Sequence, residues 1–244
     1  MNKKIALINH GCAKNLVDSE LMLGLLCEKG YDVTLNENEA DVVIVNTCSF
    51  IHDAEQESVQ TILQMVNDGK KVVVTGCLPQ KHKNELKEAI PEVCAMIGTS
   101  DLKEIVSVVE QVLNKQNDEY VSKISEKPDY IYPENVHRQQ ITMGSSSYIK
   151  IADGCNYHCG YCIIPQLRGV YHSRTIENIV EEAKELVSKG VTEIVLVAQD
   201  TTSYGIDIYG KLSLAKLLEE LNKIEGLGWI RTVSYTHLRA HETC

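Results

Sequence analysis

Short, continuous apolar runs alternate with amphipathic segments between residues 5 and 97, and this alternation is the feature that most limits the possible fold. The runs lie at residues 5–8, 42–45, 72–74 and 95–97, and the first is followed by a helical pattern from about 15 to 29 that stops at Gly30. Strands that are apolar without alternation are buried on both faces, as in parallel sheets covered by helices. We therefore predict an α/β domain with a parallel, doubly wound sheet.

A second alternation of strands and helices begins after residue 147. It comprises a strand at 148–151, a cysteine-rich loop, a helix that Thr175 and Gly190 can cap, a strand at 193–198 and a helix at 212–224. The intervening residues are polar and include Pro128 and Pro133, as is typical of a connection. We predict a first domain at 1–115, a linker at 116–147 and a second domain of βα units at 148–231.

Composition narrows the class of protein. A formal net charge of −10 provides no basic surface for a phosphate backbone, so the sequence does not suggest nucleic-acid binding. No apolar run approaches the roughly 20 residues of a membrane span, and the apolar stretch at the start is too short for a signal peptide. Nine cysteines without an export signal favour metal ligation or catalysis over disulfides, because the cytosol keeps thiols reduced. We predict a cytoplasmic protein with no membrane partner.

Cys155, Cys159 and Cys162 form a C-x3-C-x2-C arrangement directly after the predicted strand at 148–151. A zinc site usually needs four ligands in two pairs, and neither a second C-x-x-C pair nor an H-x3-H pair lies nearby. Three thiolates on a [4Fe–4S] cluster leave one iron open. That iron can bind the amino and carboxylate groups of S-adenosylmethionine (SAM) for one-electron cleavage. The spacing favours such a cluster over three buried structural cysteines.

Cys12, Cys48 and Cys77 each follow the end of a different predicted parallel strand. Ligands bind at the carboxyl ends of the strands in an open α/β sheet, so three strands would deliver three thiols to one edge. On spacing alone, a second cluster and a chance placement of three cysteines both remain open. Cys27 and Cys94 are most simply core residues.

Four spaced motifs carry a resemblance to a known family. They are GCAKNLVDSE at 11–20, NTCSF at 46–50, TGCLPQ at 75–80 and GCNYHCGYCIIPQLRG at 154–169. Together they resemble the methylthiotransferases of the radical SAM class, over residues 3 to 231. The resemblance implies a flavodoxin-like N-terminal domain followed by the start of a radical SAM (β/α) barrel. It also implies that Cys12, Cys48 and Cys77 hold a second [4Fe–4S] cluster that takes part in sulfur delivery.

The resemblance suggests supporting residues around the SAM cluster. Tyr161 matches an aromatic position near the adenine, although it could instead pack beside the cluster. Gln199 ends a predicted strand where related enzymes contact the SAM amino group, but a strand-end glutamine is often only a loop hydrogen-bonder. Arg174 and Arg168 could hold a carboxylate of SAM or of the substrate, or be surface arginines. A further charged pair in the first motif, Lys14 and Asp18, could simply be solvated.

Two branches of the family modify different substrates. The tRNA-adenosine branch typically has GCQMN and GQNV where this chain has GCAKN at 11–15 and AQDT at 198–201. The chain therefore resembles the branch that methylthiolates the β-carbon of an aspartate in small-subunit ribosomal protein twelve. We also expect an electron donor such as flavodoxin and a monomeric state. The alternatives are the tRNA branch, an iron–sulfur electron carrier without radical chemistry, and an inert fragment that only binds a partner.

The resemblance ends after Arg231, and residues 232–244 continue neither a strand nor a helix pattern. We expect this run to be a non-native tail on a truncated chain, in which Cys244 has no function. Most barrel strands and the family's C-terminal substrate-recognition domain would then be missing. Because a partial barrel exposes sheet edges, we expect the second domain to be poorly stable or prone to aggregation, and the fragment itself to lack activity.

Overall fold

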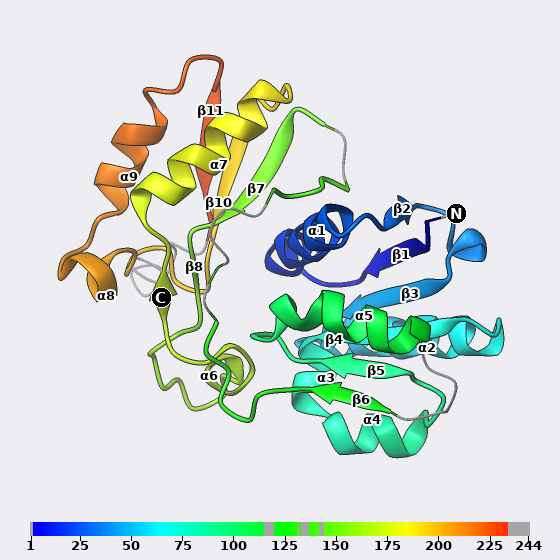
Figure 1. Ribbon diagram of the computed structural model, residues 1–244. Helices are drawn as coiled ribbons and strands as arrows, with labels where there is room; N and C mark the ends of the chain where they lie inside the picture. Colours follow the sequence, from blue (N-terminus) through cyan, green and yellow to red (C-terminus); the bar gives the residue numbers. More distant parts are fainter. Residues whose placement is uncertain (1, 115–119, 131, 133–136, 142–143, 234–244) are drawn as a thin grey trace. The chain divides into compact units, whose positions relative to one another are not determined.

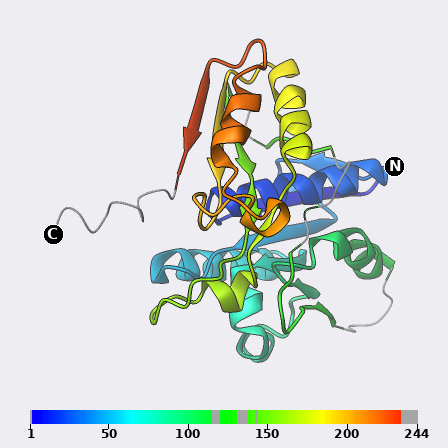
Figure 2. The same ribbon diagram turned by 90° about the vertical axis from the view of Figure 1, so that its left-hand side faces the viewer.

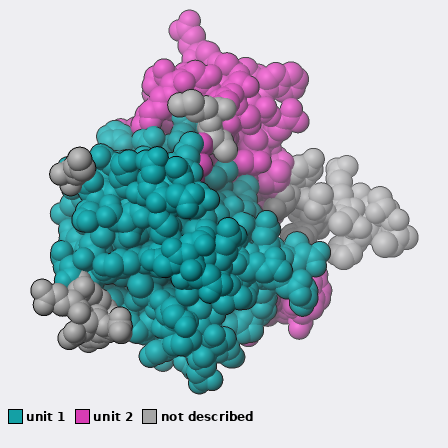
Figure 3. All heavy atoms as spheres, turned by 90° about the vertical axis from the view of Figure 1, so that its right-hand side faces the viewer, with its two compact units in different colours: residues 1–129, 135–140 teal, residues 130–134, 141–244 magenta. Residues whose placement is uncertain are grey.

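A computed structural model describes residues 2–114, 120–130, 132, 137–141 and 144–233, in two compact units. Unit 1 comprises residues 1–129 and 135–140, and unit 2 comprises residues 130–134 and 141–244 (Figure 3). Each unit has its own sheet and its own hydrophobic core.

Unit 1 contains a six-stranded sheet in the order β2-β1-β3-β4-β5-β6, and every neighbouring pair is parallel (Figure 1). Its strands are β1 (Lys4–Asn9), β2 (Asp32–Thr34), β3 (Val42–Thr47), β4 (Lys71–Gly76), β5 (Ala95–Ile97) and β6 (Val121–Lys123). The winding direction reverses between β1 and β3, as in flavodoxin-like sheets, where ligands bind beside this point. The predicted parallel α/β fold is confirmed.

Helices cover both faces of this sheet because alternate strand residues point to opposite sides. Val43, Val45, Val72 and Val74 share a core with Ile62 of α2 (His52–Asn67). Two short helices, α3 (Cys77–Lys81) and α4 (Lys83–Ala89), add Leu78 and Leu86 to this core. Two other helices, α1 (Ala13–Glu28) and α5 (Ile105–Asn114), contact each other. The 3-10 helices η1 (Glu37–Glu39) and η2 (Leu102–Glu104) lie in the connections.

Two of the six strands were not predicted from the sequence. Strand β6 lies inside the range 116–147, which we expected to be a linker, and pairs with β5. Strand β2 pairs with β1 at the opposite edge of the sheet. Both are only three residues long, and only Val121 among their residues is buried, so no continuous apolar run marks them. The polar stretch is therefore partly a component of the sheet in unit 1.

Unit 2 contains a parallel sheet in the order β11-β10-β7 (Figures 1 and 2). Its strands are β7 (Ser146–Lys150), β10 (Glu193–Val197) and β11 (Trp229–Thr232). The helices α7 (Ile176–Ser188) and α9 (Leu214–Leu221) pack against Ile149, Ile194 and Leu196. A two-stranded antiparallel pair joins β8 (Ala152–Asp153) to β9 (His172–Ser173), and α6 (Ile164–Arg168) and α8 (Ile206–Tyr209) complete the unit.

Helix α7 begins and ends at the residues that the sequence predicts. The Thr175 hydroxyl accepts a hydrogen bond from the Asn178 amide, and Gly190 follows the helix with a positive φ of 95°. Thr232, which we assigned to a non-native tail, is the last residue of β11, and residues 234–244 of that tail lie outside the described residues. Across the described part of the chain, no helix is long and apolar enough to cross a membrane.

Candidate functional site

The cysteines of the first three motifs lie at the carboxyl ends of three adjacent strands in unit 1. Cys12 is the residue before α1 and follows β1, Cys48 follows β3 directly, and Cys77 begins α3 immediately after β4. Strand β3 pairs with both β1 and β4, so the three loops leave neighbouring strands. Cys12 is exposed, Cys48 is half-buried and Cys77 is buried. This placement is the one that the sequence predicts, whereas the ligand role of the thiols stays a prediction.

A buried polar network, which we call the amide ladder, links the first two of these loops. It consists of Asn15, Ser19, Asn46 and Thr47. The side-chain Nδ2 of Asn46 donates to the backbone carbonyl of Asn15 and to the Ser19 hydroxyl, each at 2.8 Å. The side-chain Nδ2 of Asn15 donates in turn to the backbone carbonyl of Thr47 at 2.9 Å. Buried polar groups with partners hold a single geometry, so the ladder fixes the start of α1 against the end of β3.

The third loop is attached to the ladder through Thr47 and Gly76. The Thr47 hydroxyl donates to the Thr75 carbonyl at 2.6 Å and accepts from the Leu78 amide at 3.2 Å. Gly76 has a φ of 97°, and a Cβ at this position would lie 2.5 Å from both Asn46 Oδ1 and the Thr47 carbonyl oxygen. Only glycine allows this approach, which brings Cys77 next to the end of β3.

In unit 2 the C-x3-C-x2-C loop is closed by its two flanking glycines. The Cys155 amide donates to the Gly169 carbonyl at 3.1 Å, and a Cβ on Gly154 would lie 1.9 Å from the Val170 carbonyl oxygen. Within the loop, the Cys162 amide donates to the Cys159 carbonyl at 3.0 Å. These backbone contacts therefore close the loop that carries all three thiols.

The three thiols of this loop are near enough to interact electrostatically. Burial raises the pKa of the Cys155 thiol above its ordinary value, and Asp200, Cys162 and Cys159 raise it further, against a backbone hydrogen bond from Tyr157. Among the described residues, no three His, Cys, Asp or Glu side chains converge to hold a single metal ion. Thiolates of a [4Fe–4S] cluster bind different iron atoms and stand farther apart than the ligands of one ion. Three thiolates on one loop are a donor set that an iron–sulfur cluster would suit, and this ligand role stays a prediction.

Asp153 lies at the centre of a buried charged cluster beside this loop. Its Oδ2 accepts from Lys150 Nζ at 2.8 Å and from Arg168 Nη1 at 3.2 Å. Its Oδ1 accepts from the Gly154 amide at 2.9 Å and from Gln199 Nε2 at 2.6 Å. Burial alone would raise the pKa of Asp153, but Lys150 and Arg168 lower it well below the usual aspartate range. Asp153 is therefore a carboxylate that joins β7, α6 and the end of β10.

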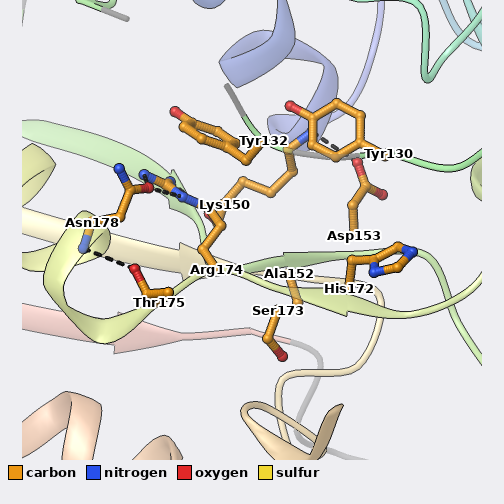
Figure 4. A pocket seen from close by; sticks show the side chains of 10 residues that line it. All are labelled: Tyr130, Tyr132, Lys150, Ala152, Asp153, His172, Ser173, Arg174, Thr175 and Asn178. Atoms are coloured by element: carbon orange, nitrogen blue, oxygen red, sulfur yellow. Dashed lines mark hydrogen bonds and ion pairs between the residues drawn. The ribbon is translucent and has the colours of Figure 1, made fainter. Parts of the chain in front are cut away.

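Figure 4 shows a pocket in unit 2 next to this cluster, with two tyrosine rings above the basic side chains. Lys150 Nζ lies 3.7 Å from the centroid of the Tyr130 ring, and Arg174 Cζ lies 3.4 Å from that of Tyr132. Such cation–π contacts stabilise a buried cation. Arg174 also donates to the Lys150 carbonyl at 2.8 Å and pairs with Glu182 at 2.5 Å.

The structure also places the other residues that the sequence singled out. Gln199 follows β10 and donates to Asp153 at 2.6 Å, and its contact with SAM stays a prediction. Arg168 and Arg174 are buried and bound to groups of the chain itself, so they are not surface arginines. Tyr161 is 95% exposed, and its place near the adenine or beside the cluster stays a prediction. Asp18 is buried, which makes the solvated pair with Lys14 the wrong interpretation.

Sequence reasoning missed Lys150, Asp153 and the two tyrosines of the pocket. One signal was present, because Lys150 interrupts an otherwise apolar strand pattern, and a charge within a buried strand needs a partner. Tyr130 and Tyr132 carried no such signal, since they stand in the polar segment that we expected to be a linker.

Comparison with known proteins gives a match for each half of the chain. Residues 4–98 match the family described as "Uncharacterized protein family UPF0004". Residues 149–239 match the radical SAM superfamily. The two matches correspond to the two cysteine regions described above.

Relatives with curated names cover nearly the whole chain. A protein of Prochlorococcus marinus (strain MIT 9215) is 50% identical over 228 residues, which are 93% of this chain and 49% of the relative. Proteins of Nostoc punctiforme and Synechocystis sp. are also 50% identical, over 93% and 92% of this chain and 51% and 50% of theirs. All three are named "Ribosomal protein uS12 methylthiotransferase RimO". The chain spans about half the length of the curated relatives it matches.

Solved structures show the same fold at low sequence identity. Two structures of the radical SAM methyltransferase TsrM from Kitasatospora setae superpose with TM-scores of 0.59 and 0.54, each at 14% identity. They cover 90% of this chain and 51% and 52% of TsrM. The two domain matches in this order, together with the named relatives, show that this chain has a UPF0004 region followed by a radical SAM domain and that it is similar over 93% of its length to proteins named as methylthiotransferases.

Proposed function

We propose that this chain is part of an enzyme that methylthiolates the β-carbon of an aspartate in small-subunit ribosomal protein uS12. The observation that carries the proposal is the 50% identity, over 93% of the chain, to relatives named for this activity. The GCAKN and AQDT runs at 11–15 and 198–201 support the ribosomal branch over the tRNA branch. A ribosomal-protein substrate would place the reaction in the cytoplasm.

The chemistry required by this substrate agrees with a radical SAM domain. The β-carbon of an aspartate side chain has no proton acidic enough for a side-chain base to remove at neutral pH, so replacing C–H by C–S calls for a radical. A [4Fe–4S] cluster with bound SAM supplies that radical. Cys155, Cys159 and Cys162 would hold the cluster, and the closed backbone between Gly154 and Gly169 would keep the thiols together.

A second cluster on Cys12, Cys48 and Cys77 is part of the proposal. Its support is the placement of these thiols at the ends of β1, β3 and β4, tied together by the amide ladder. The ladder would orient the three loops, and the sulfur donated to the substrate would come from this site. An electron donor such as flavodoxin and a monomeric enzyme remain predictions.

Iron analysis tests the number of clusters. Iron and acid-labile sulfide would be measured per chain after anaerobic reconstitution, in the parent and in the C12A/C48A/C77A variant. We expect about 8 iron atoms in the parent and about 4 in the variant. The matched control is C27A/C94A, which should retain about 8 iron atoms. Cys27 is exposed and Cys94 is half-buried, so the expectation that they are core residues was wrong, and neither belongs to the two proposed sets of ligands. About 4 iron atoms in both parent and triple variant would mean that Cys12, Cys48 and Cys77 hold no cluster.

Product analysis separates the proposed activity from its alternatives. SAM-dependent formation of 5′-deoxyadenosine distinguishes a radical enzyme from an iron–sulfur electron carrier or an inert binding fragment. Mass spectrometry of a uS12 peptide and of a tRNA anticodon stem, incubated with the full-length protein, distinguishes the two branches. Methylthiolation of the tRNA alone would contradict the ribosomal assignment.

A further inference from the structure

Asp153 determines which end of the Gln199 amide is available for a ligand. Both oxygens of this carboxylate are filled by donors, with Lys150 and Arg168 on Oδ2 and the Gly154 amide and Gln199 Nε2 on Oδ1. An ionised carboxylate only accepts hydrogen bonds, so the end of the Gln199 amide that faces it at 2.6 Å must be the NH₂ group. The carbonyl end consequently faces away from Asp153.

The outward end of the Gln199 amide is a buried acceptor. Within the described part of the chain, Gln199 Oε1 has no hydrogen-bond partner although solvent does not reach it. A buried acceptor without a donor is costly, so such an atom is expected to receive a donor when the site is filled. Tyr171 links the end of β10 to the cysteine loop, because its hydroxyl donates to the Asp200 carbonyl at 2.8 Å and its backbone amide donates to Asn156 Oδ1 at 3.0 Å.

We propose that Asp153 is a positioning residue that holds the Gln199 amide with its carbonyl toward the SAM site, where it accepts a hydrogen bond from the SAM ammonium group. This inference rests on the proposed SAM dependence. The ammonium suits the site because it carries donors and no acceptor, and a charge-assisted hydrogen bond contributes more than a neutral one. Asp153 acts by orienting the Gln199 amide and by accepting a hydrogen bond from the Gly154 amide at the start of the cysteine loop.

A donor–acceptor reversal tests the role of Asp153. In Q199E two carboxylates face each other, so at about pH 8 repulsion should displace the side chain at position 199 from Asp153, and we expect the Kd for SAM to rise roughly 10- to 100-fold. In D153N/Q199E the amide introduced at position 153 can donate to the carboxylate introduced at position 199, whose other oxygen then accepts from the ammonium. We expect this double variant to recover at least about tenfold of the lost affinity. Binding would be measured by anaerobic equilibrium dialysis on the reconstituted chain.

Three controls separate positioning from general damage. 5′-Methylthioadenosine, which lacks the amino-acid part of SAM, should bind the parent and Q199E equally. Q199A and D153N/Q199A should both bind SAM weakly, because neither has an acceptor at position 199. Electron paramagnetic resonance of the reduced cluster should change on adding SAM in the parent and in D153N/Q199E, and much less in Q199E.

The outcomes distinguish this inference from the proposed function. If the reconstituted parent binds no SAM, both fail. If the parent binds SAM and Q199E binds equally well, or D153N/Q199E recovers nothing, only the assignment of Asp153 fails. If Q199E also loses binding of methylthioadenosine, the single variant D153N tests the inference instead. In D153N the Gln199 amide is no longer held in one orientation, so we expect SAM to bind several-fold more weakly while methylthioadenosine binding is retained. Unchanged SAM affinity in D153N would overturn the inference.

Discussion

Gly76 combines a backbone conformation that other residues rarely adopt with a contact that leaves no room for a side chain. At φ 97° a Cβ would meet Asn46 Oδ1 and the Thr47 carbonyl oxygen at 2.5 Å. We expect Gly76→Ala to lower the free energy of unfolding in urea by about 2–4 kcal/mol, through backbone strain and displacement of the amide ladder. The variant should also lose iron from the site at Cys77.

Gly69→Ala is the matched control for this substitution. Gly69 has a φ of 71°, but no atom lies within 4 Å of the position of its missing Cβ. Replacing Gly69 by alanine should lower the free energy of unfolding only by the conformational strain, about 1 kcal/mol. Equal losses in the two variants would show that the contact with the ladder is unimportant.

Tyr204 should make the stability of unit 2 sensitive to alkaline pH. Burial, followed by Tyr209, raises the pKa of this tyrosine far above its ordinary value, against an opposing effect of Arg174. In the unfolded chain it ionises near pH 10. Above that pH the unfolded state has lost a proton that the folded state retains, so the free energy of unfolding falls as pH rises.

Tyr204→Phe removes this titration together with the hydrogen bond from the Tyr204 hydroxyl to the Arg174 carbonyl. At about pH 8 the variant should be less stable than the parent by about 1–2 kcal/mol. The deficit should shrink at about pH 11, because only the parent carries the alkaline penalty. Urea unfolding at the two pH values measures the effect, and a constant difference would contradict it.

At the scale of single residues, the sequence predicted where the cysteines lie better than it predicted which side chains contact one another. The six motif cysteines lie where strand ends and spacing placed them. Lys150 is only three residues from Asp153, but the other two side chains that Asp153 contacts, Arg168 and Gln199, are 15 and 46 residues away and could not be predicted from the sequence. Such contacts depend on the complete path of the chain and not on any local pattern.

Among the elements, α7 offers a direct test of its N-terminal cap. The Thr175 hydroxyl accepts from the Asn178 amide at 3.3 Å. Thr175→Ala should cost about 1 kcal/mol and speed hydrogen exchange at the Asn178 amide, whereas Thr175→Ser should retain most of the protection. Equal exchange in the alanine and serine variants would mean that the hydroxyl does not stabilise the helix.

Long elements with a buried core face were predictable, and short edge elements were not. The strands β3, β4, β5 and β10 contain predicted apolar runs because most of their residues are buried on both faces, and β1 contains a further run that is partly buried. Strands β2 and β6 are held in place by backbone pairing to a neighbour that is already ordered. Backbone pairing leaves no side-chain pattern, so these edges can be found only from the sheet itself.

At the scale of the whole molecule, each unit has a separate core and should respond separately to a core substitution. Ile149 belongs to the core of unit 2 and Val45 to that of unit 1, and both are fully buried. Ile149→Ala should cost about 2–5 kcal/mol and speed hydrogen exchange in peptides from α7 and β10 only. Val45→Ala is the reciprocal control and should affect peptides from β3 and β4 only. Faster exchange throughout both units in either variant would indicate one cooperative core.

The order of the strands in unit 1 also determines when its three strand-end cysteines can come together during synthesis of the chain. Cys12 leaves the ribosome first, but β1 meets its partner β3 only after Val42–Thr47 has been made, and Cys77 follows β4 later still. Domains generally fold as units during synthesis. The three thiols of the proposed second cluster are therefore all present only after Cys77 has emerged, and until then Cys12 must remain reduced and unligated for that cluster to assemble.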